Sequence, residues 1–270
     1  MDSIFNLITE YQSFKLNDII DYEKFNEYAI LHHSTVIEGS TLTENETRLL
    51  LEEGITPKGK PLEHSLMVKD HYEALRFVLQ QAKAPKLLTS SFIQQINAIV
   101  MKHTGSVYNT PLGQVDASKG EFRKGNVSAG GSYFINYDKV VSYTSELVNS
   151  LTERIKAISS EKEKLELSFD AHFNLVSIHP FYNGNGRTSR LLMNYLQAVF
   201  NLPLAIVYKE DKSDYFSAIQ ESRKQESLQP FTAFMYEEYR KYLQHEINTY
   251  KEDLQKQINP KKSGGRSLFF

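Results

Sequence analysis

The stretch HPFYNGNGRTSR, residues 179–190, joins two apolar helical segments and decides how this chain folds. Before it, apolar residues recur at spacings of three and four, the period of an amphipathic helix. They are Leu165, Phe169, Phe173 and Val176. Pro180 ends that helix directly after His179, because the residue before a proline is pushed out of the helical conformation. A second helix is expected from about Asn185. The residues expected to be buried on it are Leu191, Leu192, Tyr195, Leu196 and Val199.

The loop between these two helices has the composition of an anion site. Gly184 and Gly186 permit backbone conformations and close approaches that other residues forbid. The free amides at the start of the second helix attract negative charge, and the helix dipole adds to this attraction. Arg187 and Arg190 stand three residues apart in the first turn, and the fork of a guanidinium suits phosphate. The pattern indicates a polyphosphate cradle with His179 at its edge; the alternative is a plain turn with a buried histidine.

Composition excludes several other kinds of protein. The chain has 270 residues, with 31 Lys and Arg against 33 Asp and Glu, and a formal net charge of -2. That balance lacks the electrostatic footprint of a nucleic-acid-binding protein, so no nucleic-acid partner is expected. The chain has no cysteine, which excludes disulfides, thiolate nucleophiles and cysteine-based zinc sites. No signal peptide and no membrane-spanning apolar run is visible, so we expect a cytoplasmic protein without a membrane partner.

Periodic apolar patterns elsewhere predict an all-α fold. The expected helices cover residues 18–31, 62–79, 87–101, 137–158, 164–178, 185–200, 212–220 and 230–254. One segment departs from this pattern, because six glycines lie between Met101 and Tyr137. Within it, residues 126–128 and 133–135 flank a four-residue turn and predict a short β-hairpin. The hairpin is either a connector or a flap over a site.

Residues 179–190 resemble the signature of the Fic domain, H-P-F-x-[D/E]-G-N-G-R-x-x-R, a long motif with many fixed positions. Residues 120–123 and the hairpin after them are similar to the family's target-docking flap. Residues 215–219 and 230–234 look like its closing helices. The resemblance covers about residues 34–235 and implies a helical bundle with a short hairpin flap.

The resemblance also implies a division of the chain into three parts. Residues 1–85 would be an N-terminal helical region that contains an inhibitory helix at about 25–39. Residues 86–240 would be the Fic domain, and 241–270 a C-terminal helix with a loose tail. The C-terminal helix is expected either to pack on the domain or to form a homodimer face, since homodimers occur among relatives.

Members of the Fic family transfer AMP from ATP to a Tyr, Ser or Thr hydroxyl of a target protein. On this sequence the resemblance implies that His179 is the general base, for which an ordinary imidazole pKa is suited. The phosphates would be bound by Asn183, Gly184, Asn185, Gly186, Arg187 and Arg190, and Mg²⁺ would bridge them. Tyr215 would line the adenine pocket. The flap would hold an extended target segment by main-chain pairing, that is, by β-augmentation. Its residues would be Val127, Ser128, Ala129, Gly130, Gly131, Tyr133 and Phe134.

An upstream segment resembles the family's inhibitory motif, [S/T]-x-x-x-E-[G/N]. Here it reads from Ser34 to Glu38 and Gly39. Ser34 and Glu38 would share one helix face, and Gly39 would end the helix. The resemblance implies that Glu38 pairs with Arg190 and blocks the γ-phosphate position. In some relatives this glutamate also helps to remove AMP from the target.

Asn183 departs from the signature, which has Asp or Glu at this position to help bind Mg²⁺. An amide oxygen is a weaker, neutral ligand for a hard cation. Two alternatives therefore stay open beside AMP transfer. One is the transfer of another phosphate-containing group, and the other is a nucleotide-binding regulator with little or no transferase activity.

Overall fold

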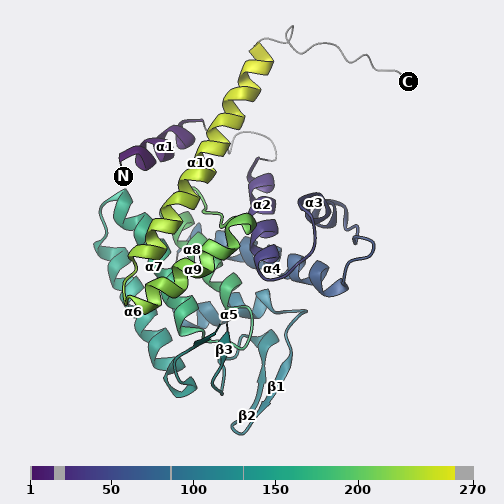
Figure 1. The fold of residues 1–270 in the computed structure, drawn as a ribbon, viewed down its shortest axis with the longest axis vertical. Helices are drawn as coiled ribbons and strands as arrows, with labels where there is room; N and C mark the ends of the chain where they lie inside the picture. The colour runs from purple at the N-terminus through teal and green to yellow at the C-terminus, as the bar shows by residue number, and fades with distance from the viewer. Residues whose placement is uncertain (1, 15–21, 86, 130, 259–270) are drawn as a thin grey trace.

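The structure is a computed structural model that describes residues 2–14, 22–85, 87–129 and 131–258 (Figure 1). Within these ranges it is an all-α fold with two small β-hairpins, which confirms the predicted fold class. The helices are α1 Asp2–Ser13, α2 Tyr22–Ile37, α3 Glu44–Glu53, α4 Leu62–Ala82, α5 Ser90–Val100, α6 Val140–Ala157, α7 Glu161–Ile178, α8 Asn185–Val199, α9 Lys212–Lys224 and α10 Gln229–Ile258. The strands are β1 Val107–Thr110, β2 Gly113–Asp116, β3 Ser128–Ala129 and β4 Ser132–Tyr133.

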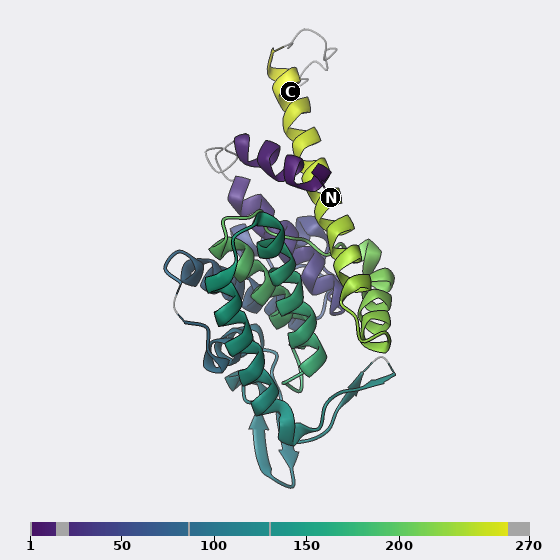
Figure 2. The same ribbon diagram turned by 90° about the vertical axis from the view of Figure 1, so that its left-hand side faces the viewer.

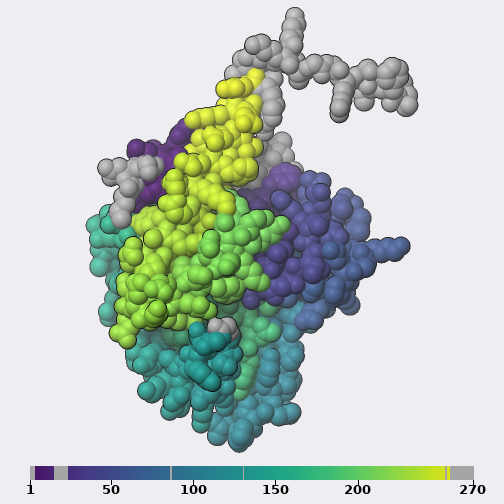
Figure 3. All heavy atoms as spheres, in the orientation of Figure 1, coloured from purple at the N-terminus to yellow at the C-terminus, as the bar shows by residue number. Residues whose placement is uncertain are grey.

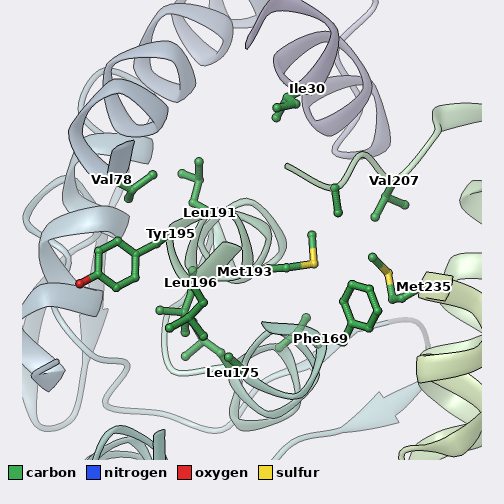
Figure 4. Packing of buried hydrophobic residues seen from close by; sticks show 14 of the residues in the cluster. Ile30, Val78, Phe169, Leu175, Leu191, Met193, Tyr195, Leu196, Val207 and Met235 are labelled. Carbon is green, nitrogen blue, oxygen red and sulfur yellow. The ribbon is translucent and has the colours of Figure 1, made fainter. Parts of the chain in front are cut away.

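Helix α8 lies at the centre of the bundle and is surrounded on all sides. It packs against α7, α4, α5 and α2. Figure 4 shows its side chains pointing in several directions into the core, toward Phe169 and Leu175 of α7 and Val78 of α4. Four of its five residues that we expected to be buried are buried, namely Leu191, Leu192, Tyr195 and Leu196. Val199, at the end of the helix, is only partly buried. A helix held this firmly gives the loop before it a rigid base.

Two helices, α1 and α3, were not predicted from the apolar spacing. Helix α3 begins at a capping box, in which the Thr43 hydroxyl accepts from the Glu46 amide and the Glu46 carboxylate accepts from the Thr43 amide. This T-x-x-E pattern is a recognised signal for the start of a helix and would have located α3. Helix α1 packs along the outer half of α10.

Both hairpins lie at the end of the molecule opposite the projecting end of α10 (Figure 2). In β3–β4, Ser128 pairs with Tyr133 and Ala129 with Ser132. The predicted four-residue turn is therefore wrong, because Ala129 and Ser132 belong to the strands. Gly130 lies outside the described residues. The second hairpin, β1–β2, was not predicted.

Helix α10 continues beyond the predicted end at residue 254 and projects past the other helices in Figure 1. The expected division between residues 240 and 241 falls inside it. Residues 259–270, the expected loose tail, are outside the described part of the chain. None of the described helices combines the length and the apolarity needed to cross a membrane.

Candidate functional site

The site begins where α7 ends, at His179. This residue has a left-handed backbone with φ of 52°, and its amide donates to the Leu175 carbonyl at 3.0 Å. A non-glycine residue in this conformation costs about 1–3 kcal/mol and persists only where its surroundings enforce it. Pro180 follows directly, so the helix cannot continue. The two residues together turn the chain sharply and leave the imidazole at the junction of α7, the loop and the β3–β4 hairpin.

The loop from Pro180 to Gly184 is fixed by the side chain of Asn185. Its Oδ1 accepts from the Phe181 amide at 3.0 Å, and its Nδ2 donates to the Phe181 carbonyl at 2.9 Å. Gly184 has φ of 78°, and a Cβ there would lie 2.8 Å from Asn97 Nδ2. The side chain of Asn185 is thus engaged with the loop, and its predicted contact with phosphate stays a prediction.

Arg187 is a buried cation on the first turn of α8. Its Nη1 donates to the Val100 carbonyl at 3.2 Å, and its Nη2 lies 3.2 Å from the Met101 Sδ. Its Nε has no hydrogen-bond partner within the described residues. Burial lowers the pKa of Arg187, and the nearby charge of Glu38 opposes this shift. A buried guanidinium with one N–H group that has no acceptor is well suited to bind an anion.

Arg190 is also buried, and it meets the predicted inhibitory residues. Its Nη2 donates to Glu38 Oε1 at 2.7 Å and to the Ser34 carbonyl at 3.0 Å. Its Nε donates to the Ser34 hydroxyl at 2.8 Å, and its Nη1 to the Tyr215 hydroxyl at 3.4 Å. These groups come from α2 and α9, so Arg190 joins three helices.

The carboxylate of Glu38 lies in the anion cradle at the start of α8. A Cβ placed on Gly186 would come within 2.3 Å of Glu38 Oε1, so a larger residue there would have to displace the carboxylate from this position. The side chain of Glu38 is 26% exposed. Burial acts to raise the pKa of Glu38, but Arg190 and Arg187 outweigh it and hold the pKa below its usual value. The carboxylate is therefore ionised and lies between Gly186 and the guanidinium of Arg190.

The end of α2 places Glu38 through a Schellman motif. The Gly39 amide donates to the Val36 carbonyl and the Ser40 amide to the Thr35 carbonyl, both at 3.0 Å. Gly39 has φ of 104°, which a residue with a side chain rarely adopts. The predicted helix end at Gly39 is where the structure has it.

Two buried histidines, which the sequence interpretation missed, complete the network around Arg190. His71 Nε2 lies 2.9 Å from the Ser34 hydroxyl, and His172 Nε2 lies 3.0 Å from the Tyr215 hydroxyl. Each hydroxyl accepts from Arg190 and also shares a hydrogen bond with the Nε2 of one histidine. Burial lowers the pKa of both imidazoles well below the usual value, so both are neutral.

His71→Ala should lower the free energy of unfolding by about 1–3 kcal/mol, because it removes the buried hydrogen bond between Nε2 and the Ser34 hydroxyl. His71→Gln should lose less, since its side-chain amide can replace that hydrogen bond. Urea unfolding of the three proteins measures the difference. A loss in His71→Ala of under about 0.5 kcal/mol, which is usual for a surface substitution, would contradict this network.

The remaining predicted residues lie around this core. Tyr215 is buried with its hydroxyl in the Arg190 network, and its contact with adenine stays a prediction. The Oδ1 of Asn183 accepts from the Gly184 amide at 2.8 Å and keeps a second lone pair. No group of three acidic or histidine side chains in the described ranges could hold a metal by itself. The predicted role of Asn183 in metal binding stays a prediction.

The described flap residues present an open strand edge and a partly buried ring, that of Phe134. Ser128, Ala129 and Tyr133 are exposed, and Tyr133 is 90% accessible to solvent. The Phe134 amide donates to the Val127 carbonyl at 3.4 Å. The exposed edge suits pairing with another strand.

Comparison with known proteins agrees with this geometry. Residues 87–197 match the model of the Fic/DOC family. The chain is 32% identical over 206 residues to the "Protein adenylyltransferase Fic" of Drosophila willistoni, covering 76% of this chain and 38% of that protein. The same protein from Drosophila melanogaster is also 32% identical over 206 residues, and 39% of it is covered. The chain thus spans about two fifths of the length of these curated relatives.

Solved structures share the fold over nearly the whole chain. A Fic-domain-containing signalling protein from Bacteroides thetaiotaomicron has a TM-score of 0.78 at 24% identity, covering 92% of this chain and 97% of the other. Residues 134–508 of Fic-1 from C. elegans have a TM-score of 0.74 at 23% identity, covering 93% of this chain and 72% of the other. The arrangement of α2 with α8 thus belongs to a fold that is shared with these proteins.

Proposed function

Since residues 87–197 of this chain form a Fic domain of the Fic/DOC family, we propose that the protein transfers AMP from ATP to a hydroxyl group of a target protein. The observation that carries the proposal is the carboxylate of Glu38 in the cradle between Gly186 and Arg190. A site that accepts one anion there, and that has a second buried guanidinium beside it, is suited to a polyphosphate.

In the proposed reaction the acceptor oxygen attacks the α-phosphorus of ATP. The bond between this phosphorus and the oxygen that bridges to the β-phosphate breaks, and pyrophosphate leaves. His179 Nε2 takes the proton of the hydroxyl. Arg187, Arg190 and the amides at the start of α8 stabilise the negative charge on the phosphates. The protein supplies positioning and electrostatic stabilisation, which is how phosphoryl-transfer sites usually act.

Mg²⁺ would enter with ATP, with the Asn183 side-chain oxygen as its protein ligand. The ion neutralises charge on the phosphate oxygens that it contacts. Because Asn183 is neutral, the phosphates must provide most of the binding of this ion. The proton transfer to His179 does not depend on the ion.

The chain is proposed to be autoinhibited by Glu38. ATP can place its γ-phosphate beside Arg190 only if the carboxylate leaves, because both are anions and both need the same guanidinium. Displacing the carboxylate breaks its 2.7 Å contact with the buried guanidinium of Arg190, so displacement is costly unless the phosphate replaces this contact.

The target segment is proposed to pair with the exposed edge of the β3–β4 hairpin. Main-chain pairing would fix the acceptor hydroxyl near His179 and would depend little on the side chains of the target segment. The hydroxyl can belong to Tyr, Ser or Thr in this scheme.

The position of the label in ATP tests the reaction class. The Glu38→Gly protein is incubated with Mg²⁺ and with ATP labelled either at the α-phosphate or at the γ-phosphate. AMP transfer predicts that protein acquires the α-label and not the γ-label. Labelling from the γ-phosphate would establish transfer of a phosphoryl group instead. ATP binding without any labelling would favour the nucleotide-binding regulator.

A further inference from the structure

A general base works best when a neighbouring group fixes the orientation of its ring. In His179 the Nδ1 atom, where such a group usually binds, is buried and has no hydrogen-bond partner among the residues described. A backbone hydrogen bond from Val176 acts to raise the pKa of the imidazole, although the Nδ1 contact falls short of strict hydrogen-bond geometry. A second contact therefore bears on the orientation of this imidazole.

The second contact is made by the aromatic ring of Phe134, which is the residue directly after β4. The ring centroids of Phe134 and His179 are 3.9 Å apart, and the two planes differ by 19°, so the rings are stacked. A stacked ring covers a face of the imidazole and leaves its edge, with the Nε2 lone pair, open to an acceptor hydroxyl.

Phe134 is in turn held by a guanidinium from α9. The Arg223 Cζ lies over the Phe134 ring, 4.9 Å from its centroid. Arg223 is fixed at the end of α7, where its Nη2 donates to the Val176 carbonyl at 3.0 Å and its Nε to the Ser177 hydroxyl at 3.2 Å. In Figure 3 the teal surface of the hairpin segment reaches the green surface of α9, in agreement with this contact.

A second guanidinium joins the backbone of the base to the backbone of the flap. The Nε of Arg123 donates to the His179 carbonyl at 2.8 Å, its Nη1 to the Gly125 carbonyl at 2.9 Å, and its Nη2 to the Ile135 carbonyl. The Arg123 amide also donates to the Pro180 carbonyl at 2.9 Å. The two ends of the flap and the loop after α7 thus form one hydrogen-bonded unit, and Phe134 is the side chain through which this unit reaches the imidazole.

We infer that Phe134 is a positioning residue, whose ring sets the orientation of the His179 imidazole and shields it from water. The flap that is proposed to hold the target would then also orient the base, which couples target docking to catalysis. The catalytic consequence of this inference rests on the proposed function. The contact between the two rings can be tested without an activity assay.

The shielding has a measurable effect on the titration of His179. Burial is the main cause that lowers the pKa of His179, to about 4. The charges of Arg223 and Arg123 act in the same direction, and Glu38 opposes them. Phe134→Ala admits water to the imidazole while it keeps all three charged groups, so the pKa should rise toward 6.5, the ordinary value, by about one unit or more.

NMR titration of the imidazole signals measures this shift. The chain has 8 histidines, and the signal of His179 is the one that His179→Ala removes. Phe134→Leu, which keeps an apolar cover but loses the flat ring, should give a smaller shift than Phe134→Ala. Tyr143→Ala is the matched control, because it removes an exposed aromatic ring from α6, and it should leave the titration of His179 unchanged.

Activity in the Glu38→Gly background gives the second readout. Phe134→Ala should lower kcat by about tenfold or more and move the acidic limb of the pH profile to higher pH, with KM for ATP unchanged.

An unchanged pKa of His179 in Phe134→Ala, or an equal shift in Tyr143→Ala, would overturn the inference. If Phe134→Ala does not fold, the same comparison is made with Phe134→Leu. If the proposed function is wrong, the Glu38→Gly protein itself will not be labelled by ATP. The NMR result does not depend on that outcome.

Discussion

Replacement of Glu38 by glycine is expected to raise labelling of the protein by ATP about tenfold or more. The carboxylate occupies the cradle beside Gly186 and holds Arg190 at 2.7 Å. If displacement of the carboxylate weakens the binding of ATP by as little as about 1.4 kcal/mol, removing the carboxylate raises labelling about tenfold. Arg190 keeps its bonds to Ser34 and Tyr215 in this variant, so the guanidinium should stay in position for the γ-phosphate. Self-labelling with α-labelled ATP measures the change.

Two further variants sharpen this prediction. Glu38→Gln keeps the shape and one acceptor oxygen but loses the charge, so its rate should lie between those of the parent and Glu38→Gly. Glu44→Ala removes an exposed carboxylate in the first turn of α3 and should leave the rate unchanged. A Glu38→Gly protein that labels itself no faster than the parent would refute the inhibitory role.

His179→Ala should reduce transfer by about 10²–10⁴ while the affinity for ATP stays the same. The expected loss is that of a general base, which acts in the transition state and does not hold the nucleotide. The contacts proposed for the phosphates come from Arg187, Arg190 and the start of α8, which the substitution leaves in place. The measurement compares initial rates with α-labelled ATP in the Glu38→Gly background and determines ATP affinity by calorimetry.

His245→Ala serves as the control for this substitution, because His245 is exposed on α10. Its rate and its affinity for ATP should match those of the background protein. If His179→Ala retained more than about a tenth of the rate, His179 could not be the general base. A large loss of ATP affinity would assign His179 to nucleotide binding instead.

The sequence predicted best those parts of the fold that local chemistry determines. Pro180 after a regular apolar helix, and Gly184 before the next, are enough to predict the turn on which the site is built. The contact between Glu38 and Arg190 was predicted from the resemblance to a known motif. Spacing alone could not have predicted it, because 152 residues separate the two side chains along the chain.

The parts that were missed depend on packing between distant elements. His71 and His172 lie behind Arg190 on α4 and α7, and no motif around either of them indicates this. The stacking of Phe134 on His179, and of Arg223 on Phe134, likewise depends on how α9 meets the flap. Short strands such as β1 and β2 offer only four residues each, too few for a clear alternation of apolar and polar side chains.

The central claim is that this site places an AMP group on protein and that His179 is the base. The most direct measurement is an intact-protein mass spectrum of the Glu38→Gly chain after incubation with ATP and Mg²⁺. The account predicts a species heavier by one AMP residue, which disappears when His179→Ala is added. An unchanged mass, or a gain equal to one phosphate group, would contradict it.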